Sequence, residues 1–75
     1  MSMLLKIITP HGVKYQGEVS RVKFPAANGL MEILEDHAPM IAAVCEGEVT
    51  VDDDILNVGG GILRVEDNKV TIVCE

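Results

Sequence analysis

The chain has 75 residues, and its six Lys and Arg against twelve Asp and Glu give a formal charge of −6. A chain of this length buries only about 60% of its unfolded surface, so we expect one small domain, residues 1–75, with a thin core. The acidic charge, with one Phe, one Tyr and no Trp, argues against nucleic-acid binding, and no apolar run reaches the ~18 residues of a membrane-spanning helix.

The first third of the chain reads as short β-strands separated by turns. Residues 3–9 are rich in β-branched and long apolar side chains, and the stretch 10–12, Pro-His-Gly, has the chemistry of a turn. Residues 13–16 alternate, and Gly17 after them predicts a bulge or bend. A further strand with one solvated face is expected over residues 18–24.

The middle of the chain continues this pattern. Residues 25–29 are predicted to form a loop, with Asn-Gly as its strongest turn signal, and residues 30–34 a strand. Residues 40–45 fit a buried helical turn or a strand. Because this apolar segment is only six residues long and is closed by Glu-Gly, we predict a strand.

The last third alternates most clearly. Residues 48–58 predict a hairpin around an acidic turn, and the glycines at 59–61 predict a bend with a closely approaching neighbouring strand. Residues 62–66 and the strand from 70 to the end flank a tight turn at Asp67-Asn68. About eight to ten short strands without an amphipathic helix predict an all-β fold, a small antiparallel β-sandwich.

Three motifs that suggest chemistry are better explained by structure. Asp52-Asp53-Asp54 lacks the spaced ligands of a calcium loop and fits a solvated turn. Gly59-Gly60-Gly61 lacks the Lys-Ser/Thr of a phosphate loop. Asp36 and His37 are adjacent on an extended segment and cannot face each other as an acid–base pair. We therefore predict no catalytic residues, no metal site and no cofactor, and hence no enzyme activity.

The cysteines and the single loop histidine are also assigned structural roles first. Cys45 and Cys74 form no CxxC pair, and together with His11 and His37 they lack zinc-site spacing, so two buried free thiols are expected in preference to a disulfide. His37 is predicted to be a hydrogen-bonded loop residue, with a role at a protein interface as the second alternative. Four residues are left open between a solvated strand face, which the composition favours, and a binding surface: Leu30, Glu32, Glu35 and Met40.

The segment 33–40, Ile-Leu-Glu-Asp-His-Ala-Pro-Met, resembles the Ile-x-Pro-Gly/Asn-His-Ala-Pro-Leu pattern of the epsilon subunit of F-type ATP synthases, in its N-terminal domain. Other matching segments follow in the family's order over nearly the whole chain: residues 4–9, 17–19, 29, 47, 60–65 and 68–73. The chain departs from the family at Glu32, where a glycine is usual, and at Glu35-Asp36, which replace Pro-Gly or Pro-Asn.

The resemblance implies a β-sandwich at the foot of the central stalk, a non-catalytic rotor subunit that couples proton or sodium flow to ATP synthesis. By position, the residues that would face the gamma subunit are Thr9, His37, Pro39 and Ala42, and those that would face the polar loops of the c-ring are Ala27, Asn28, Gly29 and Leu30. Such a subunit lies on the cytoplasmic side of the bacterial inner membrane, peripheral and not inserted. If complete, the chain lacks the inhibitory helical hairpin of many relatives. The alternative is a free-standing β-sandwich that serves as a binding or regulatory module.

Overall fold

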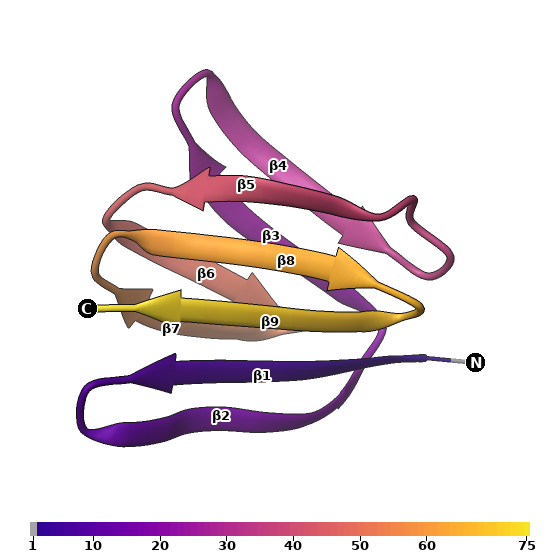
Figure 1. Ribbon diagram of the computed structural model, residues 1–75, viewed down its shortest axis with the longest axis horizontal. Coiled ribbons are helices and arrows are strands. Elements are labelled where there is room, and N and C mark those ends of the chain that lie inside the picture. The colour runs from indigo at the N-terminus through magenta and orange to yellow at the C-terminus, as the bar shows by residue number, and fades with distance from the viewer. Residues whose placement is uncertain (1) are drawn as a thin grey trace.

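The computed structural model describes residues 2–75, and over that range the chain forms nine strands and no helix. Two sheets lie face to face, one of five strands in the order β2-β1-β9-β8-β5 and one of four in the order β4-β3-β6-β7 (Figure 1). The predicted all-β sandwich is therefore confirmed. The strands are β1 Met3–Thr9, β2 Gly12–Val19, β3 Arg21–Ala26, β4 Gly29–Leu34, β5 Met40–Val44, β6 Gly47–Val51, β7 Asp54–Val58, β8 Gly61–Glu66 and β9 Lys69–Cys74.

The core lies between the two sheets and is entirely apolar. Every second side chain of most strands points inward, as the two-residue period of a strand requires. Phe24 is the largest of the buried side chains, and no polar or charged residue within 2–75 is buried. The buried set is Met3, Leu5, Ile7, Val19, Val22, Phe24, Ile33, Val44, Val49, Val51, Val58, Leu63, Val65, Val70, Ile72 and Cys74.

The strand expected over residues 18–24 is wrong, because the chain changes sheet at Ser20. β2 ends at Val19 in the five-stranded sheet, and β3 begins at Arg21 in the four-stranded sheet. Val19 and Val22 are both buried although they are three residues apart. A regular strand cannot place both on one face, so the backbone bends between them. The expected solvated face holds for β3 itself, where Arg21 is exposed and Val22 is buried.

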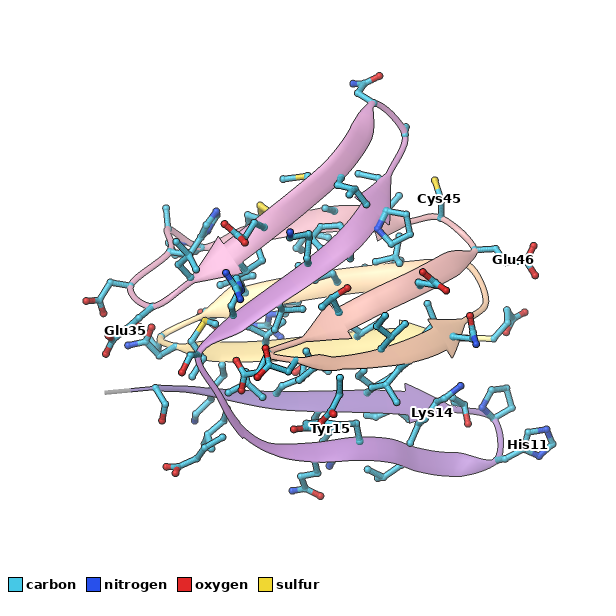
Figure 2. All side chains as sticks on the ribbon, turned by 180° about the vertical axis from the view of Figure 1, so that it is seen from behind. His11, Lys14, Tyr15, Glu35, Cys45 and Glu46 are labelled. Carbon is cyan, nitrogen blue, oxygen red and sulfur yellow. The ribbon has the colours of Figure 1, made fainter. Side chains whose placement is uncertain are left out.

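The predicted bulge exists in β2, but it lies at Lys14 and not at Gly17. Ile7 pairs with Tyr15 and Ile8 with Val13, which leaves Lys14 as the extra residue, whereas Gly17 pairs regularly with Leu5. A bulge redirects the side chain that it carries. Lys14 extends from β2 towards β7, where its Nζ donates to the carbonyl of Asn57 (Figure 2). The bulge thus connects the edges of the two sheets.

The two hairpins predicted around acidic turns are confirmed, and both turns use left-handed residues. Asp67 and Asn68 have φ of 51° and 58°, the backbone that a two-residue turn of type I′ requires. At the other turn, Asp52 has φ 52° and its Oδ1 accepts hydrogen bonds from the backbone N–H groups of Ser20 (2.9 Å) and Arg21 (3.0 Å). Asp52 therefore fixes the point at which the chain changes sheet.

One strand pairing was not anticipated from the sequence pattern. β1 pairs with β9 in parallel, from Leu4 opposite Lys69 to Ile8 opposite Val73, while the other pairs within residues 2–75 are antiparallel. The first and last strands thereby lie side by side in the middle of the five-stranded sheet (Figure 1). Alternation gives the buried face of a strand but not its partner, so this pairing left no signal in the sequence.

The cysteine prediction is half correct. Both thiols are free and Cys74 is buried, but Cys45 is exposed. Val44, the last residue of β5, is buried, so the next side chain points away from the core. Figure 2 shows Cys45 on the outside of the β5–β6 connection, next to Glu46.

Gly61 gives a stability prediction with a matched control. A Cβ at Gly61 would collide with the Val73 carbonyl oxygen and lie 2.6 Å from the Cα of Cys74, whereas a Cβ at Gly60 would only meet the Val44 oxygen at 3.5 Å. Gly61→Ala should therefore lower the free energy of unfolding by about 1–3 kcal/mol, and Gly60→Ala by much less. Urea denaturation of both variants measures this, and equal midpoints would contradict the close approach.

Candidate protein-binding surfaces

The β4–β5 loop, residues 35–39, leads from the four-stranded to the five-stranded sheet. Asp36 has φ 63°. This is a left-handed backbone conformation, which Gly and Asn adopt with less strain than most other residues. This explains why the resembling family usually has Gly or Asn at that position. The loop is tied to the β8–β9 turn, because the backbone N–H of Asp36 donates to Asn68 Oδ1 over 2.6 Å and Asn68 Nδ2 donates to Asp36 Oδ1 over 3.0 Å.

His37 is half-buried within this loop and is held at two points. Its backbone N–H donates to the carbonyl of Leu34 over 3.2 Å, and its ring Nδ1 lies 2.7 Å from the carbonyl oxygen of Ala38. With the hydrogen on Nδ1, the other ring nitrogen remains available to a partner. The predicted hydrogen-bonded role is confirmed. Pro39 follows as an exposed residue beside the start of β5.

The four residues predicted to face the c-ring form one projecting feature, the β3–β4 hairpin tip. All four residues, Ala27, Asn28, Gly29 and Leu30, are exposed. Leu30 is the one large apolar side chain among the four, and it is 69% exposed. The tip extends beyond the five-stranded sheet (Figure 1). The loop predicted over residues 25–29 is shorter than expected, since Pro25 and Ala26 still pair with β4.

The four residues predicted to face the gamma subunit do not form one patch. Thr9 ends β1, where its Oγ1 accepts from the His11 N–H at 3.1 Å, and it lies at the end of the sheet opposite His37 and Pro39. Ala42 is on β5, and its side chain packs against the core. Together with Ala43 it borders a shallow hollow of ≈ 270 Å³ at the hairpin tip, so it lies with the residues assigned to the other partner.

A continuous apolar row crosses the outer face of the five-stranded sheet. Ile8 lies opposite Val13 on one side and Val73 on the other, Val73 lies opposite Ile62, and Ile62 lies opposite Ala43. One side chain from each strand thus contributes, over about 19 Å at the usual strand spacing. Val13, Val73 and Ile62 are each more than half exposed. We call Val13, Ile8, Val73, Ile62 and Ala43 the apolar row.

The apolar row joins two of the separated gamma candidates. One hollow at its edge is lined by Ile8, Thr9, Ile62 and Val73 among others. Another leads from Pro39 along Ile41 and Arg64, and Ile41, which is 74% exposed, continues to Ile62 and Val73. The outer face of this sheet therefore connects Pro39 at one end of the molecule to Thr9 at the other.

The outer face of the four-stranded sheet is different in character. Arg21 lies 3.8 Å from Glu32 across the β3–β4 pair, and Lys23 lies opposite both Glu32 and Thr50. Ile55 is 60% exposed there, but its cross-strand neighbour is Thr50. Exposed apolar side chains on this face are thus separated by polar and charged ones. Glu32, one of the residues left open, belongs to this solvated face.

The remaining motifs have structural functions in the fold. Asp52 caps the change of sheet, and the glycines at 59–61 allow β7, β8 and the chain end to approach closely. No cluster of three metal-ligating side chains occurs among residues 2–75. The hollow of ≈ 460 Å³ beside Ile8 and Val73 is open at the surface. In the described chain, no helix is long and apolar enough to cross a membrane.

The sequence reasoning missed the apolar row, although a signal for it was present. Residues 61–65 and 70–74 are nearly continuous apolar runs, with Ile62 next to buried Leu63 and Val73 next to buried Ile72. Strands covered on both faces have such runs, whereas strands with a solvated face alternate. The apolar residues on the strand face opposite the core are therefore the sequence signal of the apolar row.

A family model for the β-sandwich domain of the ATP synthase delta/epsilon chain matches residues 2–75. The chain belongs to this family. It is 34% identical over 76 residues to the ATP synthase epsilon chain of Chlorobaculum tepidum, with 95% of this chain and 86% of that protein covered. It is 37% identical over 86 residues to the epsilon chain of Salinibacter ruber, with 97% of this chain but only 58% of that protein covered.

Solved structures of mitochondrial ATP synthase contain the same fold as this delta/epsilon-type domain. A chain in the cryo-EM structure from Euglena gracilis superposes with a TM-score of 0.89 at 20% identity, covering 97% of this chain and 50% of that one. A chain from the central stalk and c-ring structure of Tetrahymena thermophila gives 0.83 at 16% identity, covering 99% and 63%. The chain thus spans between about half and nine tenths of the relatives that it matches.

Proposed function

We propose that this chain acts as an epsilon-type subunit of the central stalk of an F-type ATP synthase and carries out no catalysis itself. The observation that carries the proposal is the family match over residues 2–75. The structure adds support, because the exposed apolar row and the projecting hairpin tip are features of a protein that is covered by partners. The subunit is peripheral, on the cytoplasmic side of the bacterial inner membrane, and needs no cofactor.

We assign the gamma subunit to the outer face of the five-stranded sheet. This face carries the apolar row between Thr9 and Pro39. It holds three cations, Lys6, Lys69 and Arg64, against the carboxylates of Glu18, Glu66 and, at its edge, Glu75, a net charge of zero (three minus three) in a chain of −6. A folded partner with an apolar patch therefore approaches it without the repulsion or hydration that the acidic parts impose.

We assign the c-ring to the β3–β4 hairpin tip. The tip is narrow, extends past the five-stranded sheet and presents the Asn28 amide beside exposed Leu30. Such a feature suits contact with short polar loops better than with a broad surface. The tip and the apolar row consist of different residues and adjoin only at Ala43, so both partners can be held at once.

The mechanism that follows is mechanical. A rotor component must pass torque between two partners without shearing, and this domain has hydrogen-bonded ladders in both sheets. Its apolar core contains no buried polar residue within 2–75, so close packing resists deformation. Lys14 adds a polar link between the sheets, and Asp52 holds the connection where the chain passes from one sheet to the other. The flow of protons or sodium ions through the ring is thereby coupled to gamma rotation and ATP synthesis.

Leu30 tests the c-ring assignment. Leu30→Arg replaces an exposed apolar side chain at the hairpin tip with a charge. It should weaken the binding of the complex between this chain and the gamma subunit to the c-ring about tenfold or more. Ile55→Arg is the matched control, since Ile55 is similarly exposed (60% against 69%) but lies on β7. Native gels of the reconstituted subunits measure this, and equal ring binding by the two variants would remove the assignment.

A further inference from the structure

Asn68 contacts two segments that are distant in the sequence. Its backbone carbonyl accepts from the N–H of Leu4 at the start of β1 over 2.9 Å. Its side-chain amide exchanges two hydrogen bonds with Asp36, one of which involves the backbone N–H of Asp36 at 2.6 Å. One turn residue therefore joins the first strand, the β8–β9 turn and the β4–β5 loop.

The loop on the other side of this contact has few other restraints. It leads from one sheet to the other, and Asp36 holds a left-handed φ of 63°, which Asp adopts less readily than Gly. Among the described residues, the only side-chain hydrogen bonds from another element to this loop come from Asn68. His37 comes next in the chain, and the hydrogen bond from its N–H to the carbonyl of Leu34 closes the turn that contains Asp36.

Asp67 differs from Asn68 in one respect that matters. It belongs to the same turn and has a similar φ, 51° against 58°. Its side chain is exposed and makes no hydrogen bond within residues 2–75. Comparing the two positions separates the effect of turn conformation from that of the contact to Asp36.

We propose that Asn68 is a positioning residue that holds the β4–β5 loop, with His37 and Pro39, in the conformation that binds the gamma subunit. This inference rests on the proposed function. A loop ordered before binding loses less conformational entropy in the complex, so its contacts contribute more to affinity. Neither Asn68 nor Asp36 is itself required to touch gamma.

The test compares Asn68→Gly with Asp67→Gly in the full chain. Glycine adopts positive φ readily, so both variants keep the turn, and only the first removes the contact to Asp36. By NMR hydrogen exchange on the free chain, Asn68→Gly should speed exchange of the His37 amide about tenfold or more, and Asp67→Gly should not. Gamma affinity should fall about tenfold in the first variant and stay within about twofold in the second.

A double substitution tests the contact directly. Asn68→Asp alone puts two carboxylates together and should weaken gamma binding, while adding Asp36→Asn restores one amide and one carboxylate in exchanged positions and should recover it. An unchanged exchange rate of the His37 amide in Asn68→Gly would overturn the proposal that Asn68 holds the loop. Faster exchange with unchanged gamma affinity would overturn its role in binding. No gamma binding by the unsubstituted chain would remove the proposed function, whatever the exchange data show.

Discussion

Replacing Ile62 with Glu should weaken binding of the gamma subunit at least about 30-fold. Ile62 lies in the middle of the apolar row, between Val73 and Ala43, and is 57% exposed in the free chain. A carboxylate buried in that contact without a partner costs about 2–5 kcal/mol of binding free energy. Titration calorimetry with the gamma subunit of the same organism measures the loss.

Ile55→Glu is the matched control for this experiment. Ile55 is 60% exposed and also lies on the outer face of a sheet, but the sheet is the four-stranded one and its neighbour is Thr50. The substitution adds the same charge, so it changes long-range electrostatics equally. We expect gamma affinity within about twofold of the unsubstituted chain. Similar losses in both variants would show that the outer face of the five-stranded sheet is not the gamma surface.

Phe24→Ala should have the largest effect on stability. Phe24 is fully buried between the sheets and is the largest core side chain. Its removal costs about 3–5 kcal/mol, whereas a domain of this size has only about 4–11 kcal/mol in all. The variant should therefore melt at least about 12 °C lower.

Thermal unfolding followed by circular dichroism measures this effect. Phe24→Leu keeps most of the apolar volume and should lower the melting temperature much less. Within residues 2–75 no buried polar network exists that could replace the stability lost with Phe24. A melting temperature unchanged by Phe24→Ala would therefore contradict a single apolar core shared by the two sheets. Binding experiments with the other variants should be run well below this transition.

Much of the secondary structure was predictable because local chemistry determines it. Alternation located the strands, and the Asp-rich and Asp-Asn turns located two hairpins. The errors arose where a non-local requirement decides. Val19 and Val22 are both buried in one core, so the strand is interrupted at Ser20. The bulge lies at Lys14, which bonds Asn57, and not at Gly17. The parallel pairing of β1 with β9 depends on the whole topology.

The candidate surfaces were predictable only in part. The c-ring set is contiguous in sequence, and a hairpin places contiguous residues together, so Ala27 to Leu30 form one tip. The gamma set comes from three segments, and only the fold shows that Thr9 and Pro39 lie at opposite ends of one sheet face. Asn68 was visible in the sequence only as a turn residue. Its contact to Asp36 spans 32 positions and has no local signature.

The departures from the family pattern are explained by the structure in two cases. Glu32 replaces a usual glycine on the exposed outer face of β4, where Arg21 lies 3.8 Å away. Asp36 replaces Gly or Asn in a left-handed position and gains the contact with Asn68. We find no structural reason for glutamate at position 35, where one carboxylate oxygen is buried without a hydrogen-bond partner.

We propose that this domain binds the gamma subunit through the outer face of its five-stranded sheet. The most direct measurement is native mass spectrometry of the chain mixed with the gamma subunit of the same organism at micromolar concentration. We expect a one-to-one complex that Ile62→Glu disrupts and Ile55→Glu does not. A folded chain that forms no complex with gamma would contradict it.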